Sequence, residues 1–173
     1  LRSVERSAGA LDVIVSYLPE RVRRARAREA AHDAVRTMRA LSEAFGAYPY
    51  PEVDLVLTGF GGFGGMEYPT VVFSTPDRPT IAHELAHQWF YGTVGNDQYH
   101  EPWLNESFAT WAAQLPFGPQ VGCSGISWPS DRAALTNDMG YWAAHPTQYG
   151  LVYDGGACML ADLAERFGSE RFV

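Results

Sequence analysis

The sequence has 173 residues, of which 46% are hydrophobic and 19% charged, and these proportions are typical of a globular domain rather than a disordered chain. The formal net charge of −7 argues against nucleic acid as the main partner, because binding to phosphates requires a basic surface. No run of about 18 apolar residues occurs, so no transmembrane segment is predicted in this chain.

The first third of the chain predicts two strands separated by a long helix. Residues 11–18 alternate between apolar and polar side chains and are partly β-branched, which indicates a strand. Apolar residues recur every three or four positions in residues 21–45, which indicates an amphipathic helix, and residues 53–58 form the second predicted strand. The chain begins with Leu1, not Met, and is interpreted as part of a longer protein. Residues 1–10 are interpreted as the tail of a preceding β domain.

A glycine-rich segment, residues 59–65, follows the second predicted strand and formally contains a Gly-x-Gly-x-x-Gly pattern. A dinucleotide site of that type needs a helix directly after the glycines, whereas a Met-Glu-Tyr-Pro sequence and an apolar run follow here. The segment therefore predicts a loop that leads into an edge strand, residues 67–74, where Pro69 is tolerated.

The remainder of the chain predicts mainly helices. Thr80 is a candidate N-cap for the first of them. Because strands precede helices, the sequence predicts an α+β domain, with a sheet lobe at residues 11–78 that includes the long helix, and a helical lobe at residues 79–173. The predicted helices of the second lobe span residues 80–91, 103–113, 131–139 and 155–167, with a polar loop at 92–101 and a Pro- and Gly-rich loop at 116–130.

The first of these helices contains a His-Glu-x-x-His pattern, His83-Glu84-Leu85-Ala86-His87. Residues four apart share one face of a helix, so His83 and His87 can direct their imidazoles at one metal ion. Glu84 lies beside them and can hold a water at the metal without ligating it. The pattern outlines a zinc hydrolase site, and the alternative is a chance match on a surface helix.

A catalytic zinc needs a third protein ligand and one open position. Glu106 on the following helix is the candidate, and eighteen residues lie between it and His87. Two antiparallel helices joined by a loop of ten residues (92–101) would return this carboxylate to the metal. Thr110, one turn later, is then placed to hydrogen-bond a ligand. The sequence thus predicts one Zn²⁺ per chain.

The chain resembles the zinc aminopeptidases of the gluzincin group, the family of aminopeptidase N and the leukotriene hydrolase. The resemblance covers residues 48–167 and implies a thermolysin-like catalytic domain, with flanking domains expected in the full protein. The motifs that carry it, in order, are Tyr48-Pro49-Tyr50-Pro51, Gly64-Gly65-Met66-Glu67, His83-Glu84-Leu85-Ala86-His87-Gln88-Trp89-Phe90, Trp103-Leu104-Asn105-Glu106 and Tyr153-Asp154-Gly155-Gly156-Ala157.

The resemblance implies a role for each matching residue. His83, His87 and Glu106 correspond to the zinc ligands. Glu84 corresponds to the glutamate that takes a proton from the attacking water and passes it to the leaving amine. Tyr153 corresponds to the tyrosine whose hydroxyl stabilises the tetrahedral oxyanion.

The resemblance also implies how the substrate binds. Glu67 corresponds to the glutamate that receives the free α-amine of a peptide. The backbone of Gly64-Gly65-Met66 is placed to pair with an extended substrate. The implied function is hydrolysis of the N-terminal peptide bond of peptides that have a free N-terminus.

Three positions depart from the family pattern. Tyr68 stands where Asn is usual, Ser107 where Gly is usual, and Gly155 where Lys is usual. None of these departures removes a group that performs chemistry, but Tyr68 and Gly155 alter the expected cleft. Two other functions are therefore kept as alternatives: a zinc endopeptidase or other hydrolase on the same site, and a non-catalytic module that retains the fold.

The two cysteines do not form a disulfide framework or a zinc-finger pattern. Cys158 lies on an apolar helix face and is predicted to be a buried thiol, with pairing to Cys123 as the alternative. His100 and His145 are predicted to be structural or exposed. The aromatic side chains expected in the core rather than in contact with substrate are Trp89, Trp103, Phe108 and Trp111.

Overall fold

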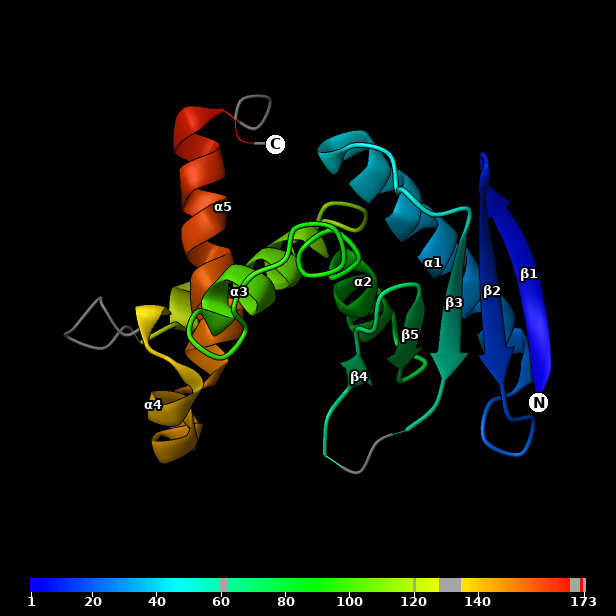
Figure 1. Cartoon of the computed structure of the whole chain (residues 1–173), viewed down its shortest axis with the longest axis horizontal. Helices are drawn as coiled ribbons and strands as arrows, with labels where there is room; N and C mark the ends of the chain where they lie inside the picture. Colours follow the sequence, from blue (N-terminus) through cyan, green and yellow to red (C-terminus); the bar gives the residue numbers. More distant parts are fainter. Residues whose placement is uncertain (60–61, 120, 128–134, 169–171, 173) are drawn as a thin grey trace.

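The computed structural model describes residues 1–59, 62–119, 121–127, 135–168 and 172, and has the α+β class that the sequence predicts (Figure 1). One mixed sheet has the strand order β1-β2-β3-β5-β4. The strands are β1 Arg2–Ala8, β2 Leu11–Tyr17, β3 Glu52–Leu57, β4 Gly65–Met66 and β5 Val71–Ser74. The helices are α1 Arg24–Phe45, α2 Arg78–Ala86, α3 Pro102–Ala112, α4 Met139–Ala144 and α5 Gly156–Phe167, with short 3₁₀ turns at Cys123–Gly125 and Pro146–Gln148 and a π turn at Leu151–Gly155.

The core lies between the sheet and the helices. β2 and β3 run parallel, and their alternate side chains are buried, so Val13 and Val15 of β2 face Val53 and Leu55 of β3. Helix α1 connects these two strands and packs on β1 and β2, while α2 packs on α1, β4 and β5. Figure 1 shows α2 standing between the sheet and the helices α3, α4 and α5. The strands predicted at residues 11–18 and 53–58 and the long helix are confirmed, with boundaries shifted by at most three residues.

The first residues of the chain form part of this sheet. Strand β1 pairs antiparallel with β2 from Arg2 opposite Tyr17 to Ala8 opposite Leu11. The sequence does not predict a strand here, because residues 1–10 show only weak alternation of apolar and polar side chains. Most of these side chains are exposed in the structure. The predicted division into residues 1–10, 11–78 and 79–173 stays a prediction.

The predicted edge strand at residues 67–74 is wrong in extent and in position. Only Val71–Ser74 is a strand, and it lies inside the sheet between β3 and β4. The chain turns between β4 and β5, where Thr70 has a φ of 66° and Pro69 has no backbone N–H for a ladder. The edge strand is therefore β4, Gly65–Met66.

Helix α2 begins and ends earlier than predicted. Its N-cap is Asp77, whose carboxylate accepts the backbone N–H of Thr80 at 3.1 Å, so Thr80 is inside the helix and is not the cap. Pro79 occupies the first turn, where a missing N–H has no cost. The α-helix stops at Ala86, and tight turns follow as far as Tyr91, which has a φ of 121°.

Replacing Asp77 with Ala is expected to lower the free energy of unfolding by about 1 kcal/mol, since a lost N-cap typically costs about 0.5–2 kcal/mol. Burial raises the pKa of Asp77, but hydrogen bonds from Thr75 and Thr80 outweigh it and hold the pKa below its usual value. The Asp77 carboxylate therefore adds to the free energy of unfolding above the pKa of the unfolded carboxyl, and this contribution is lost as the pH falls through the pKa in the folded protein. Urea denaturation at pH 7 and in acid measures both effects. A matched change at the exposed Glu20, Glu20→Ala, is expected to stay within about 0.5 kcal/mol.

Helices α3 and α5 confirm the predicted helices at residues 103–113 and 155–167. The expectation of a buried thiol at Cys158 is wrong, since Cys158 forms a disulfide with Cys123 across 35 residues of sequence. The helix predicted at residues 131–139 begins outside the described residues. Of that range only Met139 lies in α4, which begins there. Within the part of the chain that the structure describes, no helix is both long and apolar enough to cross a membrane.

Candidate metal centre and cleft

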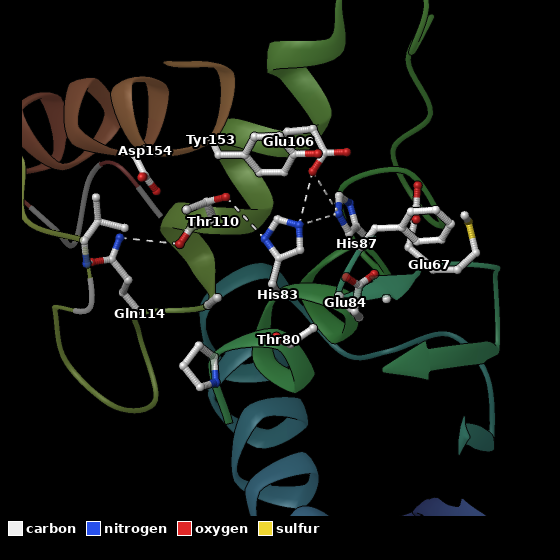
Figure 2. Close-up of a pocket in the computed structure, with 17 residues that line it drawn as sticks. Glu67, Thr80, His83, Glu84, His87, Glu106, Thr110, Gln114, Tyr153 and Asp154 are labelled. Carbon is white, nitrogen blue, oxygen red and sulfur yellow. Dashed lines mark hydrogen bonds and ion pairs between the residues drawn. The ribbon is translucent and has the colours of Figure 1, made fainter. Parts of the chain in front are cut away.

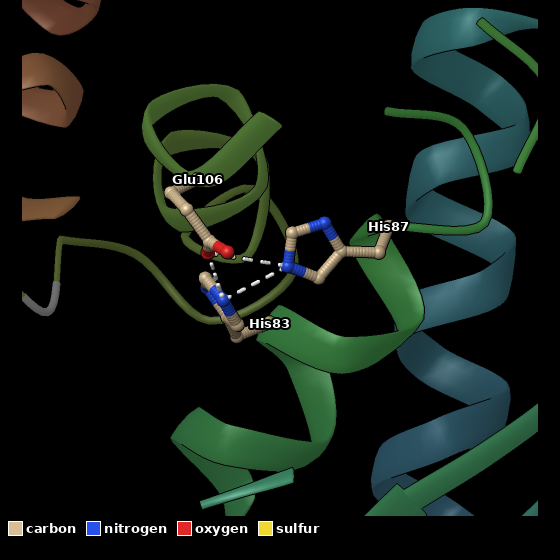
Figure 3. A group of neighbouring side chains, drawn as sticks. All are labelled: His83, His87 and Glu106. Carbon is tan, nitrogen blue, oxygen red and sulfur yellow. Dashed lines mark hydrogen bonds and ion pairs between the residues drawn. The ribbon is translucent and has the colours of Figure 1, made fainter. Parts of the chain in front are cut away.

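Three side chains from two helices converge on one point (Figure 3). His83 comes from α2, His87 from the residue that caps its end, and Glu106 from α3. The Nε2 atoms of His83 and His87 lie 3.0 Å apart, and Glu106 Oε2 lies 3.1 Å from His83 Nε2 and 3.4 Å from His87 Nε2. The structure therefore brings together the three predicted ligands, which form the only such cluster found among the described residues.

These separations fit a tetrahedral zinc ion. Bonds of 2.0–2.2 Å at tetrahedral angles place neighbouring ligand atoms about 3.3 Å apart. The three observed distances, 3.0, 3.1 and 3.4 Å, lie close to that value. Two imidazole nitrogens and one carboxylate oxygen also form one of the usual donor sets of catalytic zinc, which leaves the fourth position open.

Both imidazoles are oriented by hydrogen bonds on their outer nitrogens. His87 Nδ1 lies 3.2 Å from the carbonyl oxygen of Phe90, and His83 Nδ1 lies 3.2 Å from Thr110 Oγ1. The carbonyl requires a proton on His87 Nδ1, so in the neutral ring Nε2 is the nitrogen that can bind a cation. The Thr110 contact confirms the predicted hydrogen bond from α3 to a ligand.

The electrostatics of these three side chains also favour a bound cation. Burial lowers the pKa of His83, and burial alone would do the same for His87. The hydrogen bond and charge of Glu106 instead raise the pKa of His87 to about 9. Burial would raise the pKa of Glu106, but hydrogen bonds from both histidines hold it well below its usual value. A carboxylate thus stays ionised inside the centre, where a cation would compensate its charge.

Glu84 lies against the edge strand. The residue is 6% exposed, and burial together with the charges of Glu67 and Glu106 raises its pKa to about 8. A Cβ atom added to Gly65 would lie 2.4 Å from Glu84 Cδ. Glycine at position 65 therefore leaves room for the Glu84 side chain in its present place against β4.

A cleft of about 650 Å³ surrounds the centre, and Figure 2 shows its labelled lining. Glu67 lies on one side of the ligands, and Thr110, Gln114 and Asp154 lie on the other side. The ring of Tyr153 lies 5.8 Å from that of His83, centroid to centroid. All nine predicted site residues line this one cleft, namely Gly64, Gly65, Met66, Glu67, His83, Glu84, His87, Glu106 and Tyr153.

Buried Gln88 explains how the turn that carries Glu67 is held beside the metal centre. Its Oε1 accepts hydrogen bonds from the Tyr48 hydroxyl at 2.9 Å and from the Thr70 backbone N–H at 2.8 Å. Its Nε2 donates to the carbonyl of Tyr68 at 3.2 Å. The metal-bearing segment therefore fixes both ends of the turn between β4 and β5.

Replacing Thr110 with Val is expected to weaken zinc binding by about 10- to 100-fold, the usual cost of losing a partner of a metal ligand. The side chain keeps its volume but no longer fixes the outer nitrogen of His83. Competition with a calibrated chelator measures the affinity. The matched control is Thr37→Val, which removes a buried hydroxyl from α1, far in sequence from the metal ligands. It should leave the affinity unchanged.

The remaining predictions concern two histidines and four aromatic side chains outside the site. His100 and His145 are exposed, as predicted. The four predicted core aromatics do not line the cleft; Trp89 and Trp111 are buried, and Trp103 and Phe108 are partly buried. Sequence reasoning missed Thr80, Gln114 and Asp154 as cleft residues, and no motif marks the first two. Asp154 directly follows Tyr153 and could have been found from that position.

Known proteins resemble this chain in sequence and in structure. Residues 29–124 match the Peptidase family M1 domain. Aminopeptidase N of Streptomyces lividans is 33% identical over 114 residues, which cover 54% of this chain and 13% of that protein. Aminopeptidase M1-C of Oryza sativa subsp. japonica is 30% identical over 158 residues, which cover 72% of this chain and 18% of that protein.

The M1 zinc metallopeptidase of Deinococcus radiodurans has a crystal structure that covers 99% of this chain. The match has a TM-score of 0.65 and 23% sequence identity, and it spans 41% of that chain. At this identity the likeness concerns the fold alone. The part of this chain that aligns with the two aminopeptidases above covers less than a fifth of the length of either of them.

Proposed function

Because this chain belongs to peptidase family M1, we propose that it carries the catalytic centre of a zinc-dependent aminopeptidase that hydrolyses the first peptide bond of a peptide. The observation that carries the proposal is one cleft in which His83, His87 and Glu106 meet beside Glu84 and Glu67. The relatives are much longer, so the substrates and the activity belong to the full-length protein.

In the proposed mechanism His83, His87 and Glu106 hold Zn²⁺. When bound, zinc polarises a carbonyl oxygen and lowers the pKa of water to about 7. Glu84 accepts a proton from the attacking water and delivers it to the leaving amine. Burial raises the pKa of Glu84, which suits a group that must hold a proton, and a cation bound nearby would favour the carboxylate that accepts one.

Tyr153 is proposed to donate a hydrogen bond to the oxyanion that forms at the scissile carbonyl. Burial and the charge of Glu106 raise the pKa of Tyr153 well above its usual value, so the hydroxyl keeps its proton at any physiological pH. A fixed donor at this place stabilises the transition state more than the ground state.

Glu67 and the edge strand are proposed to align the substrate. The carbonyl of Gly64 accepts the Thr75 N–H inside the sheet, so the backbone groups of Gly65 face the open edge by the alternation of an antiparallel pair. A peptide that pairs there as an added strand can place its α-ammonium group at the Glu67 carboxylate. An endopeptidase would need this end of the cleft open to further residues, which disfavours that alternative.

The test compares an aminoacyl amide with its N-acetylated form as substrates of the zinc-loaded full-length protein. We expect acetylation to lower kcat/KM by at least about 100-fold, since a buried charge pair lost from binding commonly costs that much. Glu67→Gln should reduce this preference, whereas Glu52→Gln on β3 should not. Equal rates on both substrates would contradict an aminopeptidase.

A further inference from the structure

Two buried residues connect α3, the helix that carries the ligand Glu106, to the turn that carries the proposed oxyanion tyrosine. Ser107 directly follows Glu106, and Val152 directly precedes Tyr153. The Ser107 hydroxyl donates a hydrogen bond of 2.5 Å to the Val152 carbonyl, and Ser107 is fully buried. We infer that Ser107 is a positioning residue that fixes the place of Tyr153 relative to Glu106, an inference that rests on the proposed function.

The contact meets an unusual piece of backbone. Leu151–Gly155, which includes Tyr153, is a π turn that runs directly into α5. The π-helix, with hydrogen bonds from residue i to residue i+5, is rare and occurs mostly as a single turn next to an α-helix, frequently at a functional site. Ser107 supplies a partner from α3 at the residue before Tyr153, inside the core, where no water competes for the carbonyl.

Gly156 shows that the contact depends on close packing of the two segments. Its φ of −65° and ψ of −41° are ordinary helical values that any residue adopts. A Cβ atom there would nevertheless lie 1.9 Å from Ser107 Oγ and 2.4 Å from Ser107 Cβ. Glycine is therefore required by the Ser107 side chain and not by the backbone, so the two positions form a matched pair.

The size of the effect is bounded by what Tyr153 contributes. One oxyanion donor is worth about 10²–10³ in rate, and a displacement of about 1 Å can cost about 10²-fold. Ser107→Ala in the full-length protein is thus expected to lower kcat by about 10- to 100-fold with little change in KM and in zinc content. Thr37→Val, which also removes a buried hydroxyl that donates to a backbone carbonyl, should leave kcat unchanged.

A double-mutant cycle separates positioning from general stability. In a Tyr153→Phe background Ser107→Ala is expected to have little further effect on kcat, because the hydroxyl that it positions is already absent. A structural role would instead lower kcat by the same factor in both backgrounds. Additive effects of the two substitutions would overturn the inference.

Two further measurements do not depend on activity. In Ser107→Ala, amide hydrogens in peptides that cover Leu151–Gly155 should exchange about five- to tenfold faster, while those of α1 should not change. Gly156→Ala should lower the melting temperature, and adding Ser107→Gly should restore it, since the clashing Cβ and Oγ are then gone. Unchanged exchange in Ser107→Ala, or no rescue of Gly156→Ala, contradicts the inference. A wild-type protein that binds zinc but hydrolyses no aminoacyl substrate contradicts the proposed function alone.

Discussion

Replacing Glu84 with Gln is expected to lower kcat by about 10²–10⁴-fold while the protein still binds one zinc ion, because the amide cannot accept the proton of the attacking water. Glutamine has nearly the same shape as glutamate, so it fits the buried space against Gly65. The metal ligands His83 and His87 are untouched by the change. Elemental analysis and kcat, measured on the same zinc-loaded full-length sample, give both quantities.

The matched control is Glu52→Gln, which makes the same chemical change at an exposed position on β3. It should leave both zinc content and kcat unchanged. A Glu84→Gln protein that binds zinc and keeps its activity would refute the assignment of Glu84 as the base. Loss of zinc together with activity would instead place Glu84 among the residues that maintain the metal centre.

Replacing Tyr153 with Phe is expected to lower kcat by about 10²–10³-fold with little effect on KM, because the lost hydrogen bond acts mainly in the transition state. The ring remains, and with it the contacts to His83 and to Tyr149. Folding and zinc binding should therefore be preserved. Steady-state kinetics on an aminoacyl amide separate the two parameters.

The control is Tyr141→Phe in the same aromatic cluster, where the hydroxyl donates to Gln148 Oε1 at 3.3 Å and does not line the main cleft. It should leave kcat unchanged. An unaltered kcat in Tyr153→Phe would exclude this hydroxyl as the oxyanion donor, and Tyr149, whose ring lies 5.4 Å from that of Tyr153, would be tested next.

The metal centre could be predicted because the spacing of its two histidines along the chain is enough to place them on one face of a helix. Two histidines four apart share a helix face whatever the rest of the chain does, and His83 and His87 still converge although α2 ends at Ala86, before His87. Glu106 required one more step, the return of the next helix. Donor type and ligand count allowed that step without coordinates.

Element boundaries were less predictable because single contacts decide them. The N-cap of α2 is Asp77 and not Thr80, because the Asp77 carboxylate accepts the backbone N–H of Thr80. The strand expected at residues 67–74 breaks because Thr70 adopts a positive φ and its N–H is taken by Gln88. Periodicity over several residues does not contain this information.

The class of the fold, the three ligands and Glu84 follow from the amino-acid sequence, because spacing along a helix and donor type are local properties. The roles of Tyr153 and Glu67 follow instead from the resemblance of their motifs to the family. Contacts between residues far apart in the sequence became known from the folded structure. It placed Arg2–Ala8 in the sheet, joined Cys123 to Cys158, and set Gly65 against Glu84. It also showed that Ser107, an apparent departure from the family pattern, fits only because Gly156 lacks a side chain. Such contacts depend on how close two backbones approach, and no pattern along the chain encodes that distance.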